Sequence, residues 1–386
     1  MNQGWVSKKL KDCFKLKSGD GLTAKNMIPG DYPVFGGNSQ TGTHNTFNLS
    51  GDNIIIGRVG ALCGNARHIT ENIWLTDNAF KIMDKKYEFD NNFLTYLLNY
   101  NNLRSFARQA AQPVISNSSL KDLELDFPTD VEEQKRIVAI LDQAFADLEQ
   151  VRAKTEQNLK NARELFDSYL QQVFSQKGDG WLESTLDDSC NLITCGVAAT
   201  PKYVDKEEGI AFLSAQNVKK SKIDLSKYRY ISKEHHAHLT KNNKPQNGDL
   251  LYSRVGAGFG EAAVIELDFE FSVYVSVTLI KPIKEKLNSH FLKWFLNSPE
   301  TKAVAKASIS SSGVPNLNVK SVRAFFIAYP SLAEQEKIVN QIDLVNDLNL
   351  KVQDIYTKKL EAIGVLKKSI LQKAFSGELT LQQTNS

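Results

Sequence analysis

The stretch EEQKRIVAILD, residues 132–142, returns later in the chain as AEQEKIVNQID, residues 333–343. Each copy stands just after a proline, and the chain from 131 to 175 aligns with the chain from 332 to 376 without a gap, at a constant offset of 201 (333 − 132). Neither copy contains a proline, so both can continue as long helices. Sequence repeated at a fixed spacing predicts a duplicated structural unit.

Apolar side chains recur in both copies in alternating steps of four and three, which is the period of a coiled coil. Each helix would be about 60–65 Å long at 1.5 Å per residue. An exposed apolar stripe of that length requires a partner, and the other copy is the nearest one. We therefore expect an antiparallel coiled coil, the alternative being two separate helical hairpins. The residues expected to pair the helices or to dock a partner are Ile137, Leu141, Leu148, Val151, Leu159, Phe166, Ile338, Ile342, Val352, Leu360, Ile363 and Ile370.

The segments in front of the helices are also duplicated, but with insertions. GWVSKKL at 4–10 returns as GWLESTL at 180–186, and FLTYLLN at 93–99 returns as FLKWFLN at 291–297. The offset grows from 176 (180 − 4) to 198 (291 − 93), while the order of the matches is preserved. The chain thus divides into a first domain (1–130), a first long helix (131–178), a second domain (179–330) and a second long helix with a tail (331–386).

Both front segments have the composition of mixed α/β domains. Runs rich in β-branched and aromatic residues predict strands at 52–59, 72–84, 248–255 and 269–280, and longer amphipathic runs predict helices at 91–109 and 289–306. The expected fold class is therefore α+β, with two mixed α/β domains alternating with two long helices that pair as an antiparallel coiled coil. The polar segment QKGDG, 176–180, is the expected hinge between the halves.

Composition excludes several classes of protein. With 386 residues, 41% hydrophobic and 24% charged, the chain is typical of globular proteins. It has no apolar run long enough to span a membrane and no signal peptide, so we expect a cytoplasmic protein without membrane contact. Its four cysteines form neither a disulfide framework nor a zinc-ligand pattern, and we expect reduced, structural thiols. A net charge of +3 identifies no partner.

One phrase recurs inside the domains, RVGALCGNA at 58–66 and RVGAGFGEA at 254–262. Its arginines, Arg58 and Arg254, could approach a phosphate or a guanine edge beside a glycine turn, or could equally anchor the loop. In the second domain a basic segment interleaved with tyrosines has the mix expected where phosphates are bound, although a solvated basic face is a serious alternative. The basic candidates of this segment are Lys219, Lys220, Lys222, Lys227 and Arg229.

Two dissimilar loops are the candidates for contacts with bases, because variable side chains on a common core carry specificity. They are GGNSQTGTH at 36–44 and SAQNVKK at 214–220. Their amide and hydroxyl groups can pair with base edges, adenine being a favoured partner of Asn and Gln. The candidates are Asn38, Ser39, Gln40, Thr41, Thr43, Gln216 and Asn217.

The chain resembles the specificity subunit of type I restriction-modification systems over essentially its full length. The resemblance is carried by SILQKAFSGELT at 369–380, by EQKRIVAILD and EQEKIVNQID after a proline, and by the RVGA phrase in each domain. It implies two target-recognition domains, each binding one half of a bipartite, asymmetric double-stranded DNA site. It also implies helices that set the spacer and dock two methyltransferase subunits, with restriction subunits joining the full complex.

The resemblance implies a non-catalytic chain with no cofactor of its own, S-adenosylmethionine, ATP and magnesium being bound by partner subunits. The residues agree, since no Pro-Pro pair exists for adenine methylation and GNSQTGTH lacks the lysine of a phosphate-binding loop. We expect no metal site at HHAH, 235–238, and no nuclease at PTDVEEQK, 128–135. The alternatives are a stand-alone S-adenosylmethionine-dependent DNA methyltransferase and a coiled-coil scaffold that binds proteins.

Overall fold

The computed structural model describes residues 4–37, 39–108, 112–256, 258–309 and 315–380. The chain forms two compact units, unit 1 (Met1–Thr155 with Lys358–Ser386) and unit 2 (Glu156–Thr357). The two long helices, α4 (Val131–Ser175) and α10 (Leu332–Phe375), each contribute one part to each unit. The predicted boundaries lay at the helix ends, whereas the compact units divide within the helices. Each unit is thus a globular domain together with a stretch of both long helices.

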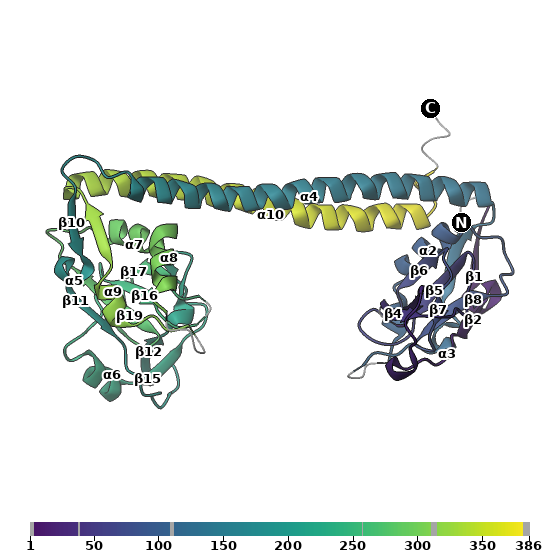
Figure 1. Ribbon diagram of the computed structural model, residues 1–386, viewed down its shortest axis with the longest axis horizontal. Helices are drawn as coiled ribbons and strands as arrows, with labels where there is room; N and C mark the ends of the chain where they lie inside the picture. The colour runs from purple at the N-terminus through teal and green to yellow at the C-terminus, as the bar shows by residue number, and fades with distance from the viewer. Residues whose placement is uncertain (1–3, 38, 109–111, 257, 310–314, 381–386) are drawn as a thin grey trace. The chain divides into compact units, whose positions relative to one another are not determined.

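The domain of unit 1 is built on a four-stranded antiparallel sheet with a helix on one face (Figure 1). The strands lie in the order β2 (Lys15–Ser18), β8 (Ala79–Met83), β5 (Asn53–Gly57) and β6 (Ala66–Ile69). Helix α2 (Asn91–Tyr100) covers this sheet, and Asp90 caps it by accepting a hydrogen bond from the backbone N–H of Phe93. The isoleucines of β5 are buried on both faces, Ile54 and Ile56 against α2 and Ile55 in a smaller cluster. A continuous apolar strand is expected where both faces are covered.

Two smaller sheets complete the domain of unit 1. One is three-stranded, in the order β4 (Gln40–His44), β3 (Tyr32–Phe35) and β7 (Trp74–Leu75), with β3 and β7 parallel. The other is an antiparallel ribbon of β1 (Trp5–Lys9) and β9 (Glu124–Pro128) that leads directly into α4. The short helices of this domain are α1 (Leu10–Cys13), η1 (Ala24–Asn26), η2 (Leu103–Phe106) and α3 (Asn117–Leu120).

Unit 2 repeats this plan. Its four-stranded sheet has the order β11 (Cys190–Cys195), β19 (Val277–Pro282), β16 (Leu250–Ser253) and β17 (Ala262–Val264). The three-stranded sheet is β15 (Arg229–Ser232), β12 (Gly209–Leu213) and β18 (Phe271–Val273), and the ribbon is β10 (Leu182–Thr185) with β20 (Phe326–Tyr329). The helices are α5 (Leu186–Ser189), α7 (Ser289–Asn297), α8 (Pro299–Ala307) and α9 (Val319–Arg323).

Four elements of unit 2 have no counterpart among the described elements of unit 1. They are the short helix η3 (Ala215–Asn217), the hairpin of β13 (Val218–Lys219) and β14 (Lys222–Ile223), and helix α6 (Lys233–Thr240). All four lie between β12 and β16, where unit 1 has only β4 between β3 and β5. This insertion explains why the offset between the copies grows along the domains.

A buried glutamine attaches each long helix to its domain. The Gln134 side chain accepts a hydrogen bond from Asp90 N (2.9 Å) and donates to Pro128 O (2.9 Å) and Glu88 O (3.3 Å). Gln335 makes the same three contacts in unit 2, with Asn288 N (2.8 Å), Pro330 O (2.9 Å) and Lys286 O (2.8 Å). Both side chains have 0% exposure. Each glutamine therefore ties the start of a long helix to the preceding strand and to the cap of the domain helix.

The substitution Gln134→Ala should destabilise unit 1 by about 2–4 kcal/mol, because it leaves one buried N–H and two carbonyls without their partner. Gln335→Ala should have a similar effect on unit 2. The matched control is Gln143→Ala, an exposed glutamine of the same helix. Denaturant unfolding of the purified chain measures the difference, and equal stability of the Gln134→Ala and Gln143→Ala chains would contradict this role.

A second contact repeats about two helical turns further along, eight residues after each glutamine (142 − 134 and 343 − 335). The Tyr96 hydroxyl of α2 donates to Asp142 Oδ1 of α4 (2.6 Å), and in unit 2 Trp294 Nε1 of α7 donates to Asp343 Oδ1 of α10 (2.7 Å). The two pairs occupy equivalent positions, although an indole replaces a phenol. Two fixed contacts, about two turns apart, set the angle at which each domain meets its helix.

The long helices pack antiparallel within each unit. In unit 1, Lys367 of α10 forms an ion pair with Glu149 of α4 (3.3 Å) and lies over the ring of Phe145 (4.8 Å). In unit 2, Arg163 of α4 donates to Gln353 of α10 (3.2 Å). In both units the beginning of one helix therefore lies beside the end of the other, as the coiled-coil prediction requires.

The predicted stripe is not buried between the two helices alone. Ile137, Leu141 and Ile342 are fully buried, and the core clusters that hold them join residues of both long helices to a domain, as Ile137 and Leu141 are joined to Phe375 of α10. Phe166 packs edge-on against Trp294, and Ile338 and Ile370 also pack against the domain cores. Val151 (37%) and Val352 (40%) are exposed. Leu148, Leu159, Leu360 and Ile363 are half-buried.

Three other predicted segments differ from the structure. Most of GGNSQTGTH is strand β4 and not a loop, because residues 40–44 pair with β3. The helix predicted at 91–109 ends at Tyr100 and is followed by the short η2, and the one predicted at 289–306 breaks at Ser298 before Pro299. Proline at the first position of α8 favours a new helix start over a continuation.

Candidate nucleic-acid interface

The RVG phrase of unit 1 forms a tight loop between β5 and β6. Gly60 and Gly64 adopt φ angles of 94° and 85°, which only glycine adopts readily. Gly60 N donates to Pro113 O (3.0 Å) and Gly64 N donates to Gly57 O (2.7 Å). A side chain on Gly64 would place its Cβ 2.5 Å from the backbone N of Arg104. The glycines therefore allow this loop to pack directly on the segment after α2.

Unit 2 builds the same loop from the second copy of the phrase. Gly256 and Gly260 have φ angles of 93° and 82°, Gly256 N donates to Pro315 O (3.1 Å), and Gly260 N donates to Ser253 O (2.8 Å). The phrase recurs because the same backbone turn and the same contacts occur in both domains. We call these two segments, 58–64 and 254–260, the glycine loops.

Arg254 anchors its glycine loop. Its side chain is 8% exposed and donates to Leu317 O (2.7 Å), Asn316 Oδ1 (2.9 Å) and Val275 O (3.2 Å). Arg58 is half-buried, donates to Asp77 O (3.2 Å) and lies over the ring of Phe80 (5.4 Å). Of the two roles considered for Arg254, the structure therefore supports anchoring of the loop. The predicted DNA contact is corrected, because the guanidinium of Arg254 is already bound on three sides.

The two candidate base-contacting segments follow equivalent strands, β3 and β12, and the first of them lies beside its glycine loop. In unit 1 the close approach is shown by Gly37, whose Cβ would lie 2.0 Å from Val59 O. Ser39, Gln40, Thr41 and Thr43 are exposed, and Asn38 lies outside the described residues. Apart from bonds to nearby backbone oxygens, such as that of Gln40 Nε2 to Gly42 O (3.4 Å), these side chains face solvent.

In unit 2 the two amides of the loop differ. Gln216 is exposed. Asn217 is 1% exposed, and its side chain accepts from Ser214 N (3.0 Å) and donates to Asp224 O (2.8 Å) and Lys227 O (2.9 Å). Asn217 therefore holds the loop, and its selection as a base contact is corrected, because its amide is fully used within the domain.

The basic segment of unit 2 lies on the inserted hairpin and on β15. Lys219, Lys220, Lys222, Lys227 and Arg229 are all exposed, and Lys220 stands in the hairpin turn with a φ of 50°. Lys219 pairs with Asp224 (3.1 Å), and Arg229 lies over the ring of Tyr203 (5.3 Å). These cations can reach phosphates, but one of them is already neutralised.

Two basic residues that contact the glycine loops from the segments after the domain helices were not among the predicted DNA contacts. Arg104 of unit 1 donates to Ala61 O, and Lys302 of unit 2 pairs with Glu261 (2.6 Å). The signal was present in the sequence, since the two residues align at the offset of 198 (302 − 104) that relates the domain helices.

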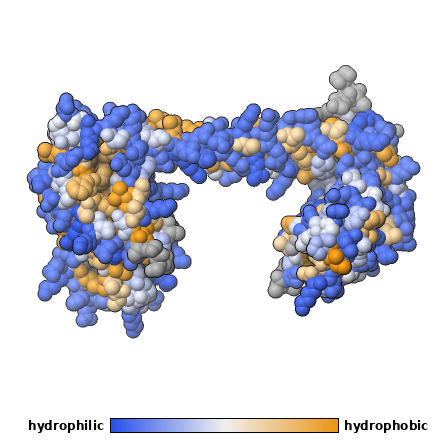
Figure 2. All heavy atoms as spheres, viewed as in Figure 1, coloured by the Kyte–Doolittle hydropathy of each residue, from blue (hydrophilic) through white to orange (hydrophobic). Residues whose placement is uncertain are grey.

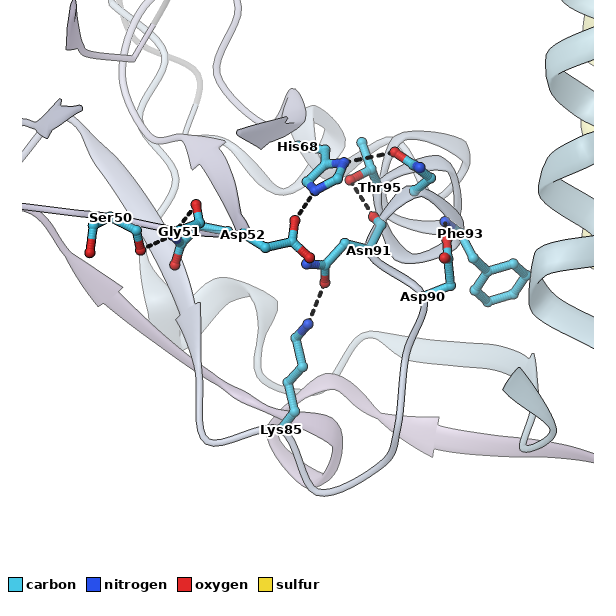
Figure 3. A network of polar contacts seen from close by, with 11 residues as sticks. Ser50, Gly51, Asp52, His68, Lys85, Asp90, Asn91, Phe93 and Thr95 are labelled. Carbon is cyan, nitrogen blue, oxygen red and sulfur yellow. Dashed lines mark hydrogen bonds and ion pairs between the residues drawn. The ribbon is translucent and has the colours of Figure 1, made fainter. Parts of the chain in front are cut away.

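A polar network joins the sheet of unit 1 to the start of α2 (Figure 3). His68 on β6 bonds to Asp52 through Nε2 and to Asn92 through Nδ1 (2.8 Å). Burial lowers the pKa of His68, but its bonds to Asp52 and Asn92 outweigh burial and leave the pKa raised. The hydrogen bond from His68 lowers the pKa of Asp52.

The sign of each shift defines when this pair stabilises the domain. His68 stabilises the folded domain fully below its unfolded pKa, and this stabilisation is lost as the pH rises through its raised folded pKa. Asp52 stabilises the folded domain above its unfolded pKa, and this stabilisation is lost as the pH falls through its lowered folded pKa. In unit 2 the position equivalent to His68 is Val264, and a different ion pair, Glu266 with His290 (3.5 Å), links the segment after β17 to α7. The His68 network is therefore particular to unit 1, where it links the sheet to the start of α2.

Other histidines and cysteines of the described ranges have structural surroundings. His236 of the HHAH segment is buried and bonds to Ser272 (2.9 Å) and Glu270 (3.3 Å). Burial raises the pKa of Cys13 to about 11 and that of Cys190 to about 12, so neither is a reactive thiolate at neutral pH. Among the described residues no group of three metal-ligating side chains occurs. Within the same ranges no helix has the length and apolar content to cross a membrane.

Comparison with known proteins identifies the family. The family model for the type I restriction modification DNA specificity domain matches residues 2–160 and 178–358. The chain belongs to this family. The two matched segments coincide with the duplicated halves, so each half is one copy of the family's domain.

Relatives and solved structures agree with this assignment. The specificity subunit of the type I restriction enzyme EcoBI from Escherichia coli is 25% identical over 293 residues, which cover 69% of this chain and 61% of that protein. That of StySPI from Salmonella potsdam is 24% identical over 73% of this chain and 63% of its own length. The chain thus matches less than two thirds of the length of these relatives.

Two solved structures share the fold. A chain from a structure of the type I R-M system, solved to explain its complex assembly and conformational transition, superposes with a TM-score of 0.78 at 18% identity, covering 98% of this chain and 99% of that one. The HsdS subunit of Thermoanaerobacter tengcongensis superposes with a TM-score of 0.56 at 18% identity, covering 98% of each chain. These likenesses confirm the predicted α+β fold with two long helices.

Proposed function

We propose that this chain is the DNA-specificity subunit of a type I restriction-modification complex in the cytoplasm, each domain binding one half of a bipartite double-stranded site. The observation that supports the proposal most directly is that the glycine loop and its neighbouring polar segment occur twice, once in each domain of the same chain. The glycine loops are alike in both units, whereas the neighbouring loops after β3 and β12 differ in sequence. A common backbone with dissimilar exposed polar side chains is what two different half-sites require.

The proposal makes the chain a non-catalytic subunit. S-adenosylmethionine, ATP and magnesium would be bound by two methyltransferase subunits and by restriction subunits, and the paired helices would fix the spacer between the half-sites. An exposed apolar face on α10 supports docking on the helices. Leu344 (63%), Leu348 (54%) and Ile355 (62%) succeed one another on this face, and apolar surface is visible on the helices in Figure 2.

The test uses the full chain produced together with the methyltransferase subunit of the same system. The complex should retard duplex DNA that carries its site with a dissociation constant of about 10⁻⁸–10⁻¹¹ M, at least roughly a thousandfold tighter than random duplex at the same salt concentration. Binding without sequence preference would favour the protein-binding scaffold. Binding of S-adenosylmethionine by the chain alone would favour the stand-alone methyltransferase.

A further inference from the structure

A pair of basic residues follows the domain helix in both units. In unit 1 it is Arg104 and Arg108, and in unit 2 it is Lys302 and Lys306. Both pairs keep the offset of 198 (302 − 104 and 306 − 108), and the five-residue segments that contain them read RSFAR and KAVAK. Only the basic character of the ends, an apolar centre and one alanine survive between the copies.

The first member of each pair is fastened to the glycine loop. Arg104 donates to the carbonyl of Ala61, within the loop, and Lys302 pairs with Glu261 (2.6 Å), directly after it. Leu317 and Ile115, which follow these segments, donate from their backbone N–H groups to Arg254 O (2.8 Å) and Arg58 O (2.9 Å). Each basic pair and its glycine loop are therefore held together as one surface.

The second member of each pair is exposed. Arg108 and Lys306 face solvent, and no hydrogen bond or ion pair of either side chain is found with any residue in the described ranges. The apolar residue between the two cations is also exposed, Phe106 at 36% and Val304 at 47%, whereas Ala305 is buried. Cations left without an acid partner beside a repeated backbone turn are available to an anionic ligand.

We propose that Arg108 and Lys306 bind the DNA phosphates in each half of the chain, and that Arg104 and Lys302 fasten these cations beside the glycine loop. This inference rests on the proposed function. Residues that recognise bases should differ between two unlike half-sites, but residues that bind phosphates should keep their charge. The exchange of Arg for Lys between copies fits a phosphate contact, because phosphate oxygens accept hydrogen bonds from either cation.

The helix α8 fixes the side from which Lys306 projects. Lys302 and Lys306 stand four residues apart, which places their Cβ atoms about 5–6 Å apart on one face, and the ion pair of Lys302 with Glu261 holds that face beside the glycine loop. Val304, two residues from each lysine, lies on another face of the helix. The phosphate contact would position the neighbouring loops over the base edges without selecting a sequence.

The test uses a double variant that carries both Arg108→Ala and Lys306→Ala. The control is a double variant that carries both Arg136→Ala and Lys337→Ala. The control removes one Arg and one Lys that are also duplicated (337 − 136 = 201) and exposed at 61% and 73%, but that pair with Glu133 and Glu334 on the long helices. Binding of the intact methyltransferase complex to duplex DNA is measured against salt concentration. We expect the slope of log K against log salt to fall by about 2 in the test variant, roughly 0.9 for each lost cation, and to stay unchanged in the control.

Each half can also be tested alone. Ethylation of a contacted phosphate blocks binding of the complex. Arg108→Ala should abolish this interference in one half-site, and Lys306→Ala should abolish it in the other. The methylated base sequence should stay unchanged in both variants. The conservative variant Arg108→Lys with Lys306→Arg should keep the wild-type slope, and this result separates loss of charge from loss of folding.

The failures are distinguishable. A wild-type complex that binds no duplex specifically would refute the proposed function together with this inference. A wild-type complex that binds, with an unchanged slope in the double alanine variant, would overturn the phosphate contact alone. A change in the methylated base sequence would also overturn it, because the residues would then recognise bases.

Discussion

A chain in which residues 1–130 are replaced by a second copy of residues 179–330 should direct methylation to a site whose two halves contain the same bases. The half-site of the original first domain should no longer be recognised, and the half-site of the second domain should be retained. Each mismatched base pair costs about 1–3 kcal/mol, so a replaced half-site of a few base pairs should weaken binding to the original site by roughly a thousandfold or more.

The structure explains why such an exchange should fold. A domain placed at the start of the chain must pack on α4, and α4 offers Gln134, Val138 and Asp142 where α10 offers Gln335, Val339 and Asp343. The transplanted Trp294 would meet Asp142 in place of Asp343, and the backbone N–H of Asn288 would meet Gln134. The buried hydrogen bonds at the junction are therefore available to either domain at either helix.

Sequencing of methylated bases in cells that carry the exchanged chain gives the result directly. The wild-type chain is the control. A change in both half-sites, or a site identical to that of the wild type, would contradict the assignment of one half-site to each domain.

The long helices could be predicted because their signal is local. A 3.5-residue apolar period and the absence of proline over 45 residues of α4 and 44 of α10 leave few other structures. What each stripe residue contacts is not local. Leu141 and Ile342 carry the coiled-coil period, yet they pack in domain cores, because the same apolar face continues from the helix partner onto the domain. Periodicity indicates that a side chain is buried, but not by what.

The candidate site was predictable only in part, for the same reason. The recurrence of the RVG phrase indicated a repeated turn, and the glycine φ angles agree with it. The environment of Arg254 depends on Leu317 and Asn316, 63 and 62 residues further along the chain, so phosphate contact and anchoring could not be distinguished beforehand. Asn217 was misassigned because a polar residue in a loop is indistinguishable from a buried cap until its partners, Ser214, Asp224 and Lys227, are placed.

The duplication itself is the strongest source of information that a single sequence offers here. Positions that keep their chemistry in both copies perform a common task, as Gln134 and Gln335 show, and positions that differ in exposed loops are free to differ in specificity. The basic pairs after the domain helices keep their positive charge in both copies, although Arg in one copy is replaced by Lys in the other. In this they differ from the buried glutamines, which keep their identity, and from the exposed loop residues, which keep neither identity nor charge.

The variant Leu344→Lys with Leu348→Lys should lose a methyltransferase subunit from the complex, while both domains remain folded. These leucines are exposed and touch neither domain core, so the substitutions should not unfold the chain. If a partner helix covers them, each loses about 1.5–3 kcal/mol of apolar burial, and the partner should bind on the order of a hundredfold more weakly or worse. The isolated variant chain should also aggregate less, because an exposed apolar face has been removed.

The other long helix supplies the matched control. The positions on α4 that correspond to Leu344 and Leu348 are Gln143 and Asp147 (344 − 201 and 348 − 201), and they are already polar and bonded to each other (3.0 Å). The control Gln143→Lys with Asp147→Lys should leave the association almost unchanged.

The two helices thus offer unequal surfaces to the two methyltransferase subunits of the proposed complex. We therefore expect the wild-type complex to release one methyltransferase subunit before the other when it is diluted. The Leu344→Lys, Leu348→Lys variant should release the subunit bound to α10 at a higher protein concentration than the wild type does. Sedimentation over a dilution series measures the stoichiometry. If the variant complex dissociates at the same concentration as the wild type, the partner does not lie on this face of α10, and the exposed leucines must be covered by something else or remain in contact with water.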